Sequence, residues 1–202
     1  MKPIFRCSVL LIALLITSFS YSQNTAPVNY LNTPAQLSFN NTSFTLAWSA
    51  HPSGQYYKQE YLPKGETVDD FKSMLLLEVV ISSLTVKEAF DAKVAELKAM
   101  KQANPYVNFE TFYHAASDEY VLDFVVTANS ADGKQINIAE RNIYRYKKYT
   151  GPGGRNGVIL FGVSKRSYGS EALKFVTGLT SANRQDLVNK VKIFTVPDIR
   201  LK

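Results

Sequence analysis

Alternating hydrophobic and polar residues predict a series of antiparallel strands in the second half of the chain. We expect strands near residues 119–127, 135–149 and 157–168. The segments between them are rich in Gly, Asn, Asp and Pro, which favour tight chain reversals. The pattern therefore predicts an antiparallel meander.

Helical spacing replaces this alternation in three places. Thr85 and Glu88 form a capping-box pattern, apolar residues then recur every three or four positions, and Pro105 ends the run. This predicts a helix over residues 85–104. Two further helices are expected over residues 170–179 and 181–194.

The first half of the chain predicts additional strands. Residues 43–49 and 55–62 form a hairpin pattern around a turn at 51–54, and a further strand is expected near 107–114. Thr67 is a plausible helix cap, so we expect a short helix followed by a strand within 74–81. The predicted fold is α+β, an antiparallel sheet of about six or seven strands with helices packed on it.

The N-terminus has the composition of a secretory signal. Lys2 and Arg6 precede a short apolar run at 9–16, and small residues follow it before Gln23. We therefore predict a cleaved signal peptide at 1–22, an extended lead-in at 23–40 and a single α+β domain at 41–202. The mature chain would be exported, to the periplasm or beyond, with no transmembrane segment. Cys7 is the only cysteine, so the mature chain would lack disulfides and thiolate chemistry.

Charge is distributed unevenly along the chain. Residues 23–133 contain 7 basic and 13 acidic residues, whereas residues 134–202 contain 14 and 4. Two domains of opposite charge would explain this, but no linker separates the halves. We favour one domain with an acidic side and a basic side.

Recognisable catalytic motifs are missing. His51 and His114 are the only histidines, so we predict no metal site, no cofactor and no catalytic residue. The glycine-rich stretch 151–157 resembles a phosphate loop in composition, but a strand follows it where a helix would be needed. A flexible hairpin loop explains it better, with Arg155 at its tip.

The most promising pattern for binding is a set of cations interleaved with aromatic residues on neighbouring strands. If this set is exposed on one face, it can stack rings and bind anions. Export disfavours nucleic acid and favours an anionic glycan, a lipid headgroup or an acidic protein. An ordinary sheet surface has a similar composition and is the competing explanation. The residues are Arg141, Tyr144, Arg145, Tyr146, Lys147, Arg155, Lys165 and Arg166.

Asp123 interrupts an apolar strand and would need a partner if its face is covered. Arg141 or Arg145 on the next strand could supply one, depending on a register that alternation does not determine. A buried ion pair between Asp123 and Arg141 is therefore a structural hypothesis rather than a catalytic one.

Several short stretches resemble parts of known families. Residues 56–63 with Phe71 and Met74, and residues 157–158 and 164–166, are similar to uncharacterised exported proteins of Bacteroidota-type bacteria. The order of hairpin, helix, long antiparallel sheet and closing helices resembles the PsbP-like α/β/α sandwich. That resemblance implies accessory and binding roles and no catalytic residue.

These observations favour an exported, non-catalytic binding or accessory protein. An inhibitor or immunity-type protein that binds a secreted partner is the first alternative. A hydrolase with dispersed carboxylates, such as Asp123 and Glu60, is the second.

Overall fold

The computed structural model describes residues 26–202, so the predicted signal peptide lies outside the described residues. Eight strands, three α-helices and one short 3-10 helix follow in chain order. They are β1 Gln36–Phe39, β2 Thr42–Ser53, β3 Tyr56–Leu62, β4 Ser73–Ile81, α1 Val86–Ala103, β5 Asn108–His114, β6 Glu119–Asn129, β7 Ile136–Thr150, η1 Pro152–Gly154, β8 Asn156–Tyr168, α2 Ser170–Thr177 and α3 Ser181–Ile193.

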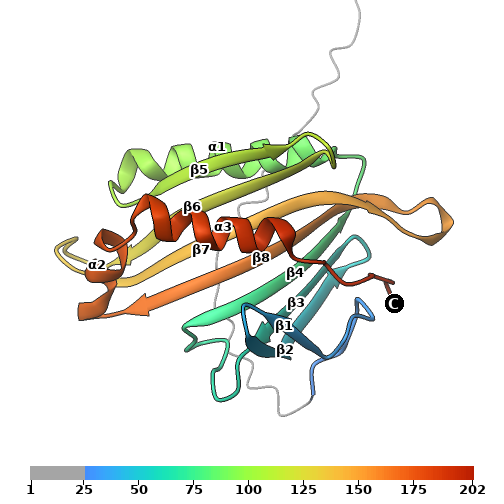
Figure 1. Ribbon diagram of the computed structural model, residues 1–202, viewed down its shortest axis with the longest axis horizontal. Coiled ribbons are helices and arrows are strands. Elements are labelled where there is room, and N and C mark those ends of the chain that lie inside the picture. The colour runs from blue at the N-terminus through green and yellow to red at the C-terminus, as the bar shows by residue number, and fades with distance from the viewer. Residues whose placement is uncertain (1–25) are drawn as a thin grey trace, which may run out of the picture.

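The strands form one antiparallel sheet in the order β1-β2-β3-β4-β8-β7-β6-β5 (Figure 1). Two meanders, β1 to β4 and β5 to β8, are each built from strands consecutive in sequence. They join where β4 pairs with β8, in a continuous register from Ser73↔Lys165 to Ile81↔Gly157. The three strands of the predicted meander, β6 to β8, are therefore part of a larger sheet.

The sheet has eight strands, so the prediction of six or seven was wrong. The additional strand is β1, which lies inside the stretch expected to be an extended lead-in. It pairs with β2 through a turn in which Asn40 and Asn41 have φ angles of 49° and 61°. Asn tolerates this left-handed conformation better than most residues do. Four residues are too few to show a periodicity, so the pattern did not reveal β1.

The short helix expected after Thr67 is also absent. The Thr67 hydroxyl accepts a hydrogen bond from the Asp70 amide, which makes a local turn instead of a helix cap. The Glu66 carboxylate then accepts hydrogen bonds from the amides of Lys72 and Ser73. β4 starts directly there, and its apolar run is buried strand.

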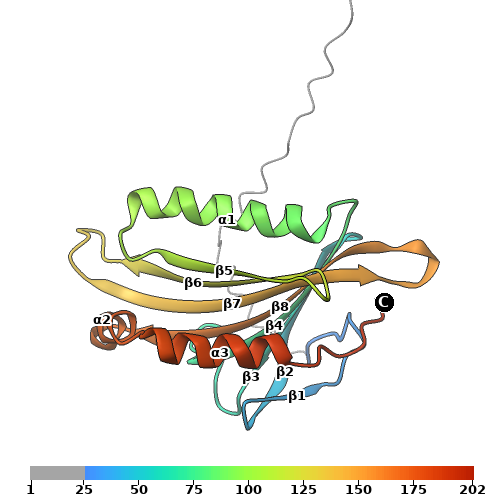
Figure 2. The same cartoon turned by 45° about the horizontal axis from the view of Figure 1, so that its top comes forward.

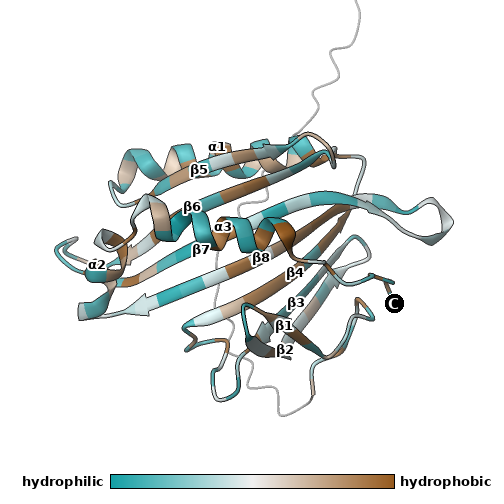
Figure 3. Cartoon of the chain, viewed as in Figure 1, coloured by the Kyte–Doolittle hydropathy of each residue, from teal (hydrophilic) through white to brown (hydrophobic). Residues whose placement is uncertain are grey.

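Helices cover both faces of the sheet, α1 on one face and α3 on the other (Figure 2). The face under α1, called the α1 face, packs Phe90 and Leu97 of the helix against Leu122, Phe124 and Tyr146. The opposite face, called the α3 face, has the larger core. Its members include Leu75, Leu77, Ile143, Phe161, Val163, Leu187, Val188 and Val191. Hydrophobic residues accordingly run along β4 and the middle of β8 (Figure 3).

The predicted helix at 85–104 is confirmed as α1. Thr85 caps it, with its hydroxyl accepting from the Glu88 amide while the Glu88 carboxylate accepts from the Thr85 amide. Each partner satisfies a backbone group that the first turn leaves free. No helix in the part of the chain that the structure describes is long and apolar enough to cross a membrane.

The two ends of the described chain lie together on the α3 face. The amides of Arg200 and Lys202 donate to the carbonyls of Leu31 and Tyr30, at 2.9 and 3.0 Å. The Leu31 amide in turn donates to the side chain of Gln59, which is fully buried. The folded domain therefore includes residues from the predicted lead-in.

Candidate functional site

Strand alternation divides the predicted binding residues between the two faces of the sheet. On β7, Arg141 and Arg145 point to the α3 face, and Tyr144 and Tyr146 point to the α1 face. Both arginines are largely buried, and Tyr146 packs under α1. The basic and aromatic residues therefore do not form one exposed surface.

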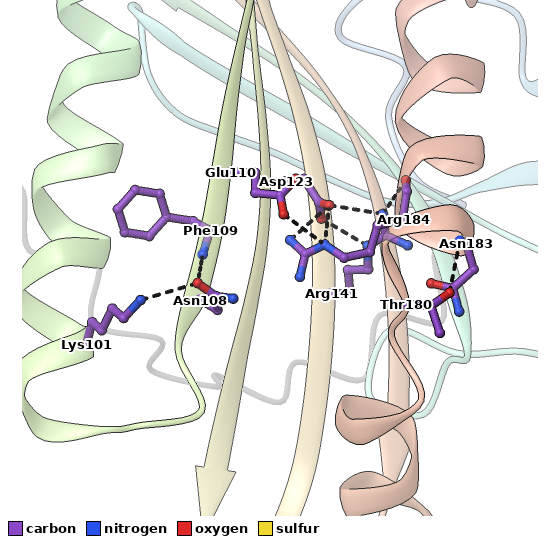
Figure 4. A network of polar contacts seen from close by, with 9 residues as sticks. All are labelled: Lys101, Asn108, Phe109, Glu110, Asp123, Arg141, Thr180, Asn183 and Arg184. Atoms are coloured by element: carbon purple, nitrogen blue, oxygen red, sulfur yellow. Dashed lines mark hydrogen bonds and ion pairs between the residues drawn. The ribbon is translucent and has the colours of Figure 1, made fainter.

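Arg141 and Asp123 are brought together on the α3 face (Figure 4). Asp123 lies opposite Ile143 and diagonal to Arg141, and the guanidinium Nε donates to Oδ1 at 2.9 Å. Arg184 of α3 donates from Nε to Oδ2 of the same carboxylate at 3.0 Å. The carboxylate is 0% exposed, so two guanidinium groups balance one deeply buried charge. This arrangement connects α3 to the sheet, and both oxygens of the Asp123 carboxylate accept hydrogen bonds from arginines.

Arg145 makes a second connection between the sheet and α3. Its Nε donates to Glu119 at 2.6 Å, and its Nη1 donates to the carbonyl of Phe194 at 2.7 Å. That carbonyl lies at the C-terminal end of the helix, where a cation is favourable. Lys147 lies 3.9 Å from the same Glu119 carboxylate.

A cleft of about 260 Å³ opens beside this connection, between the end of α3 and the β5–β6 turn. We call it the α3 cleft. Val121 and Ile193 supply its apolar walls, and Ile193 is 81% exposed. Its polar lining consists of His114, Ser117, Glu119, Arg145, Asn189 and Lys192.

Positive charge exceeds negative charge around the α3 cleft. Glu119 is its one lining carboxylate, and it faces both Arg145 and Lys147. The Lys192 ammonium lies 4.4 Å from the centre of the Phe112 ring. Within residues 26–202, no carboxylate forms an ion pair with Lys192. A compact anionic group fits this charge balance.

The histidine of the α3 cleft is not arranged for nucleophilic catalysis. His114 Nδ1 lies 2.8 Å from the Ser117 hydroxyl, on the short β5–β6 turn. Glu119 lies opposite His114 across the strand pair, but its carboxylate is paired with Arg145 and, in the described chain, forms no ion pair with the imidazole. A relay of serine, histidine and carboxylate is therefore not assembled.

The remaining predicted residues lie elsewhere. Arg155 follows η1 at the exposed tip of the β7–β8 hairpin. Lys165 donates to the Ser73 hydroxyl at 2.9 Å, and its burial lowers its pKa. Arg166 pairs with Glu140 on the α1 face and stacks its guanidinium over Phe71. None of these three lines the α3 cleft.

A second polar group lies on the α1 face and includes Glu60. Lys58 lies 2.9 Å from Glu60 and 3.8 Å from Glu78. Burial raises the pKa of Glu78, although Lys58 and a hydrogen bond from Tyr56 act against the rise. Burial lowers the pKa of Lys58, but the two carboxylates outweigh it and the net direction is upward. The group is a mixed cluster with a lysine between two acids.

The carboxylates considered for a hydrolase are not neighbours. Glu60 lies on the α1 face, whereas Asp123 lies under α3 on the opposite face. In residues 26–202, no group of three or more His, Cys, Asp and Glu side chains is placed to hold a metal ion.

A protein-family model matches residues 31–196, which is most of the chain and includes all eight strands. The family is uncharacterised. No curated protein and no solved structure matches the chain.

Proposed function

The chain belongs to this uncharacterised family, and we propose that it is an exported, non-catalytic protein that binds an anionic group through the α3 cleft. The observation that carries the proposal is the charge balance of the cleft. Arg145 and Lys192 line the cleft together with a single carboxylate, that of Glu119, and Lys147 lies 3.9 Å from that carboxylate. A negative group entering the cleft would complete that balance.

The size of the cleft limits what it can accept. At about 260 Å³ it is slightly smaller than the pockets of roughly 300–1,000 Å³ that enclose drug-sized ligands. It suits the end of a larger molecule, such as a uronic acid residue, a phosphate headgroup or an acidic side chain. The apolar wall formed by Val121 and Ile193 would contact the uncharged part of that molecule.

The non-catalytic part of the proposal rests on the surrounding groups. Asp123 and Glu119 both form ion pairs with arginines, and His114 is hydrogen-bonded to Ser117. A catalytic acid or base needs a group free to exchange a proton with a substrate. An inhibitor of a secreted protein would bind an acidic side chain of its partner in the same cleft. The test must therefore distinguish a glycan, a lipid headgroup and an acidic protein as the source of the anionic group.

The test is a titration followed by amide resonances of the labelled, exported protein. Three probes are compared at low and high salt: oligogalacturonate, vesicles containing phosphatidylglycerol, and a glutamate-rich peptide. We expect one probe to shift the resonances of Ser117, Asn189 and Lys192, with affinity falling as salt increases. Shifts with the peptide alone would favour the inhibitor role.

Two lysine variants of equal charge change test the location. Lys192→Ser removes a cation of the cleft, and Lys174→Ser removes an exposed cation of α2. Only Lys192→Ser should weaken binding. Equal weakening by both variants, or no shift with any probe, contradicts the proposal. Arg141 is unsuitable for this test because its removal leaves Asp123 buried with one cation fewer.

A further inference from the structure

The strand β5 forms one edge of the sheet. Within residues 26–202 it pairs only with β6, in an unbroken register from Asn108↔Val125 to His114↔Glu119. Each of its seven residues is exposed or half-buried. Helix α1 packs on Leu122 and Phe124 of β6 and on Tyr146 of β7, and it also contacts Phe109 of β5. Lys101 of α1 donates to the Asn108 side chain at the start of β5, at 3.3 Å.

β5 has only part of the usual protection of an edge strand, namely the charge of Glu110. Edge strands are commonly short, bulged, or interrupted by Lys or Pro, which prevents pairing with another chain. β5 contains neither Lys nor Pro, and its pairing with β6 has no bulge. The opposite edge, β1, has only four residues. The two edges therefore differ in their capacity to accept another strand.

We propose that β5 pairs antiparallel with β5 of a second copy of this chain, around a two-fold axis at Thr111. The two sheets would then join into one continuous sheet. Such an interface places the same strand on both sides, so the strand must be complementary to itself. The sequence of β5 meets this condition.

This register determines which side chains of the two copies lie opposite each other. Thr111 faces Thr111 of the second copy, and Phe109 faces Tyr113 of the second copy. Glu110 faces Phe112, so no two like charges lie directly opposite each other. The Glu110 carboxylate is also 3.9 Å from Arg184 of its own chain, which offsets its charge.

The aromatic residues of β5 give this contact its apolar part. Tyr113 is 56% exposed, and its ring packs against Tyr120 with centroids 4.7 Å apart. Tyr120 in turn contacts Phe90 of α1. Pairing would place Phe109 of the second copy beside Tyr113 and extend this row of rings across the interface. A seven-residue strand pair buries little area, so association should depend on concentration.

Disulfide trapping tests the register directly. In the full chain, Cys7→Ser with Thr111→Cys leaves one cysteine, and the two-fold axis places its two copies opposite each other, within disulfide reach. We expect oxidation to yield a covalent dimer. Cysteine at Glu110 is a control in the same strand, because its two copies lie on opposite sides of the axis, about 8 Å apart. Cysteine at Ser38, on the β1 edge, controls for random collision.

Sedimentation of the unmodified chain gives the second measurement. We expect a monomer–dimer equilibrium that Thr111→Lys abolishes, because two ammonium groups would meet at the axis. At concentrations where both proteins are monomeric, the thermal midpoint should be unchanged, since Thr111 is exposed. A chain that stays monomeric at high concentration, or equal cross-linking at Thr111 and Ser38, overturns the proposal. Thr111 lies opposite Leu122 on the α1 face, whereas the α3 cleft lies on the other face, so Thr111→Lys tests pairing without changing a residue that lines the cleft.

Discussion

Arg184 of α3 and Asp123 of β6 are 61 residues apart in the chain and 3.0 Å apart in space, Nε to Oδ2. Arg141 donates two further hydrogen bonds to the same carboxylate and one to the Arg184 carbonyl. These ion pairs attach the N-terminal half of α3 to the sheet. Farther along the helix, Leu187, Val188 and Val191 pack in the core of the α3 face.

Replacing Asp123 with Asn should destabilise the protein strongly. Two guanidinium groups would remain buried against a neutral amide, and breaking such a pair costs about 3–5 kcal/mol. Urea unfolding measures this free energy. Glu110→Gln is the matched control, because that carboxylate is 55% exposed and should contribute less than about 0.5 kcal/mol. Similar losses of unfolding free energy for both variants would contradict the prediction, because the buried carboxylate would then contribute no more than the exposed one.

Glu78→Gln should change how stability depends on pH. Burial raises the pKa of Glu78 above its ordinary value of 4.5, so folding favours the protonated carboxyl. The wild type should therefore lose stability relative to the variant as pH rises from about 4.5 through the folded pKa, by about 1.4 kcal/mol for each pKa unit. Unfolding free energies of both proteins across this range measure the difference. A constant difference would contradict the prediction.

Glu88→Gln should give the opposite trend. Hydrogen bonds from the Thr85 amide and hydroxyl lower the pKa of Glu88, so folding favours the carboxylate. Its contribution is present above the unfolded pKa and is lost as pH falls through the folded pKa. Measured alongside Glu78→Gln, this variant shows whether the sign of each trend follows the environment of the carboxyl.

Gly157→Ala should destabilise the junction between the two meanders. A Cβ atom at Gly157 would lie 2.0 Å from the Val80 carbonyl oxygen, and a backbone atom in the middle of a sheet has little room to move. We expect the free energy of unfolding, measured by heat or urea, to fall by about 1–3 kcal/mol. Gly54→Ala, with no atom within 4 Å of its Cβ position, should stay within about 0.5 kcal/mol of the wild type.

Local signals in the sequence predicted most of the elements. The capping box located α1 because Thr85 and Glu88 interact only with each other and with the adjacent backbone. The strands β6, β7 and β8 were predicted within two residues at each end, because alternation and turn residues agree there. β1 was missed because its four residues depend on pairing with β2 and on core contacts of Leu37 and Phe39.

The candidate site was harder to predict because its contacts are long-range. Strand alternation alone places Arg145 and Tyr144 on opposite faces, so the interleaved cations and rings of β7 do not share one surface. Arg145 donates hydrogen bonds to Glu119, 26 residues away, and to the carbonyls of Val191 and Phe194, more than 40 residues away. No pattern in the sequence distinguishes Lys192 from other lysines, because its place in the α3 cleft depends on how α3 packs beside β5.

The pairing of β4 with β8 has a consequence for how the chain reaches its native state. β4 is almost entirely apolar, and its second neighbour is a strand that begins 75 residues after β4 ends. Closing so long a loop is slow compared with forming either meander, whose strands are adjacent in sequence. Until residues 156–168 have been synthesised, β4 is paired with β3 alone, and its free apolar edge favours aggregation. A chain truncated before β8 should therefore need a chaperone to stay unaggregated. The complete chain covers the free edge of β4 by pairing it with β8.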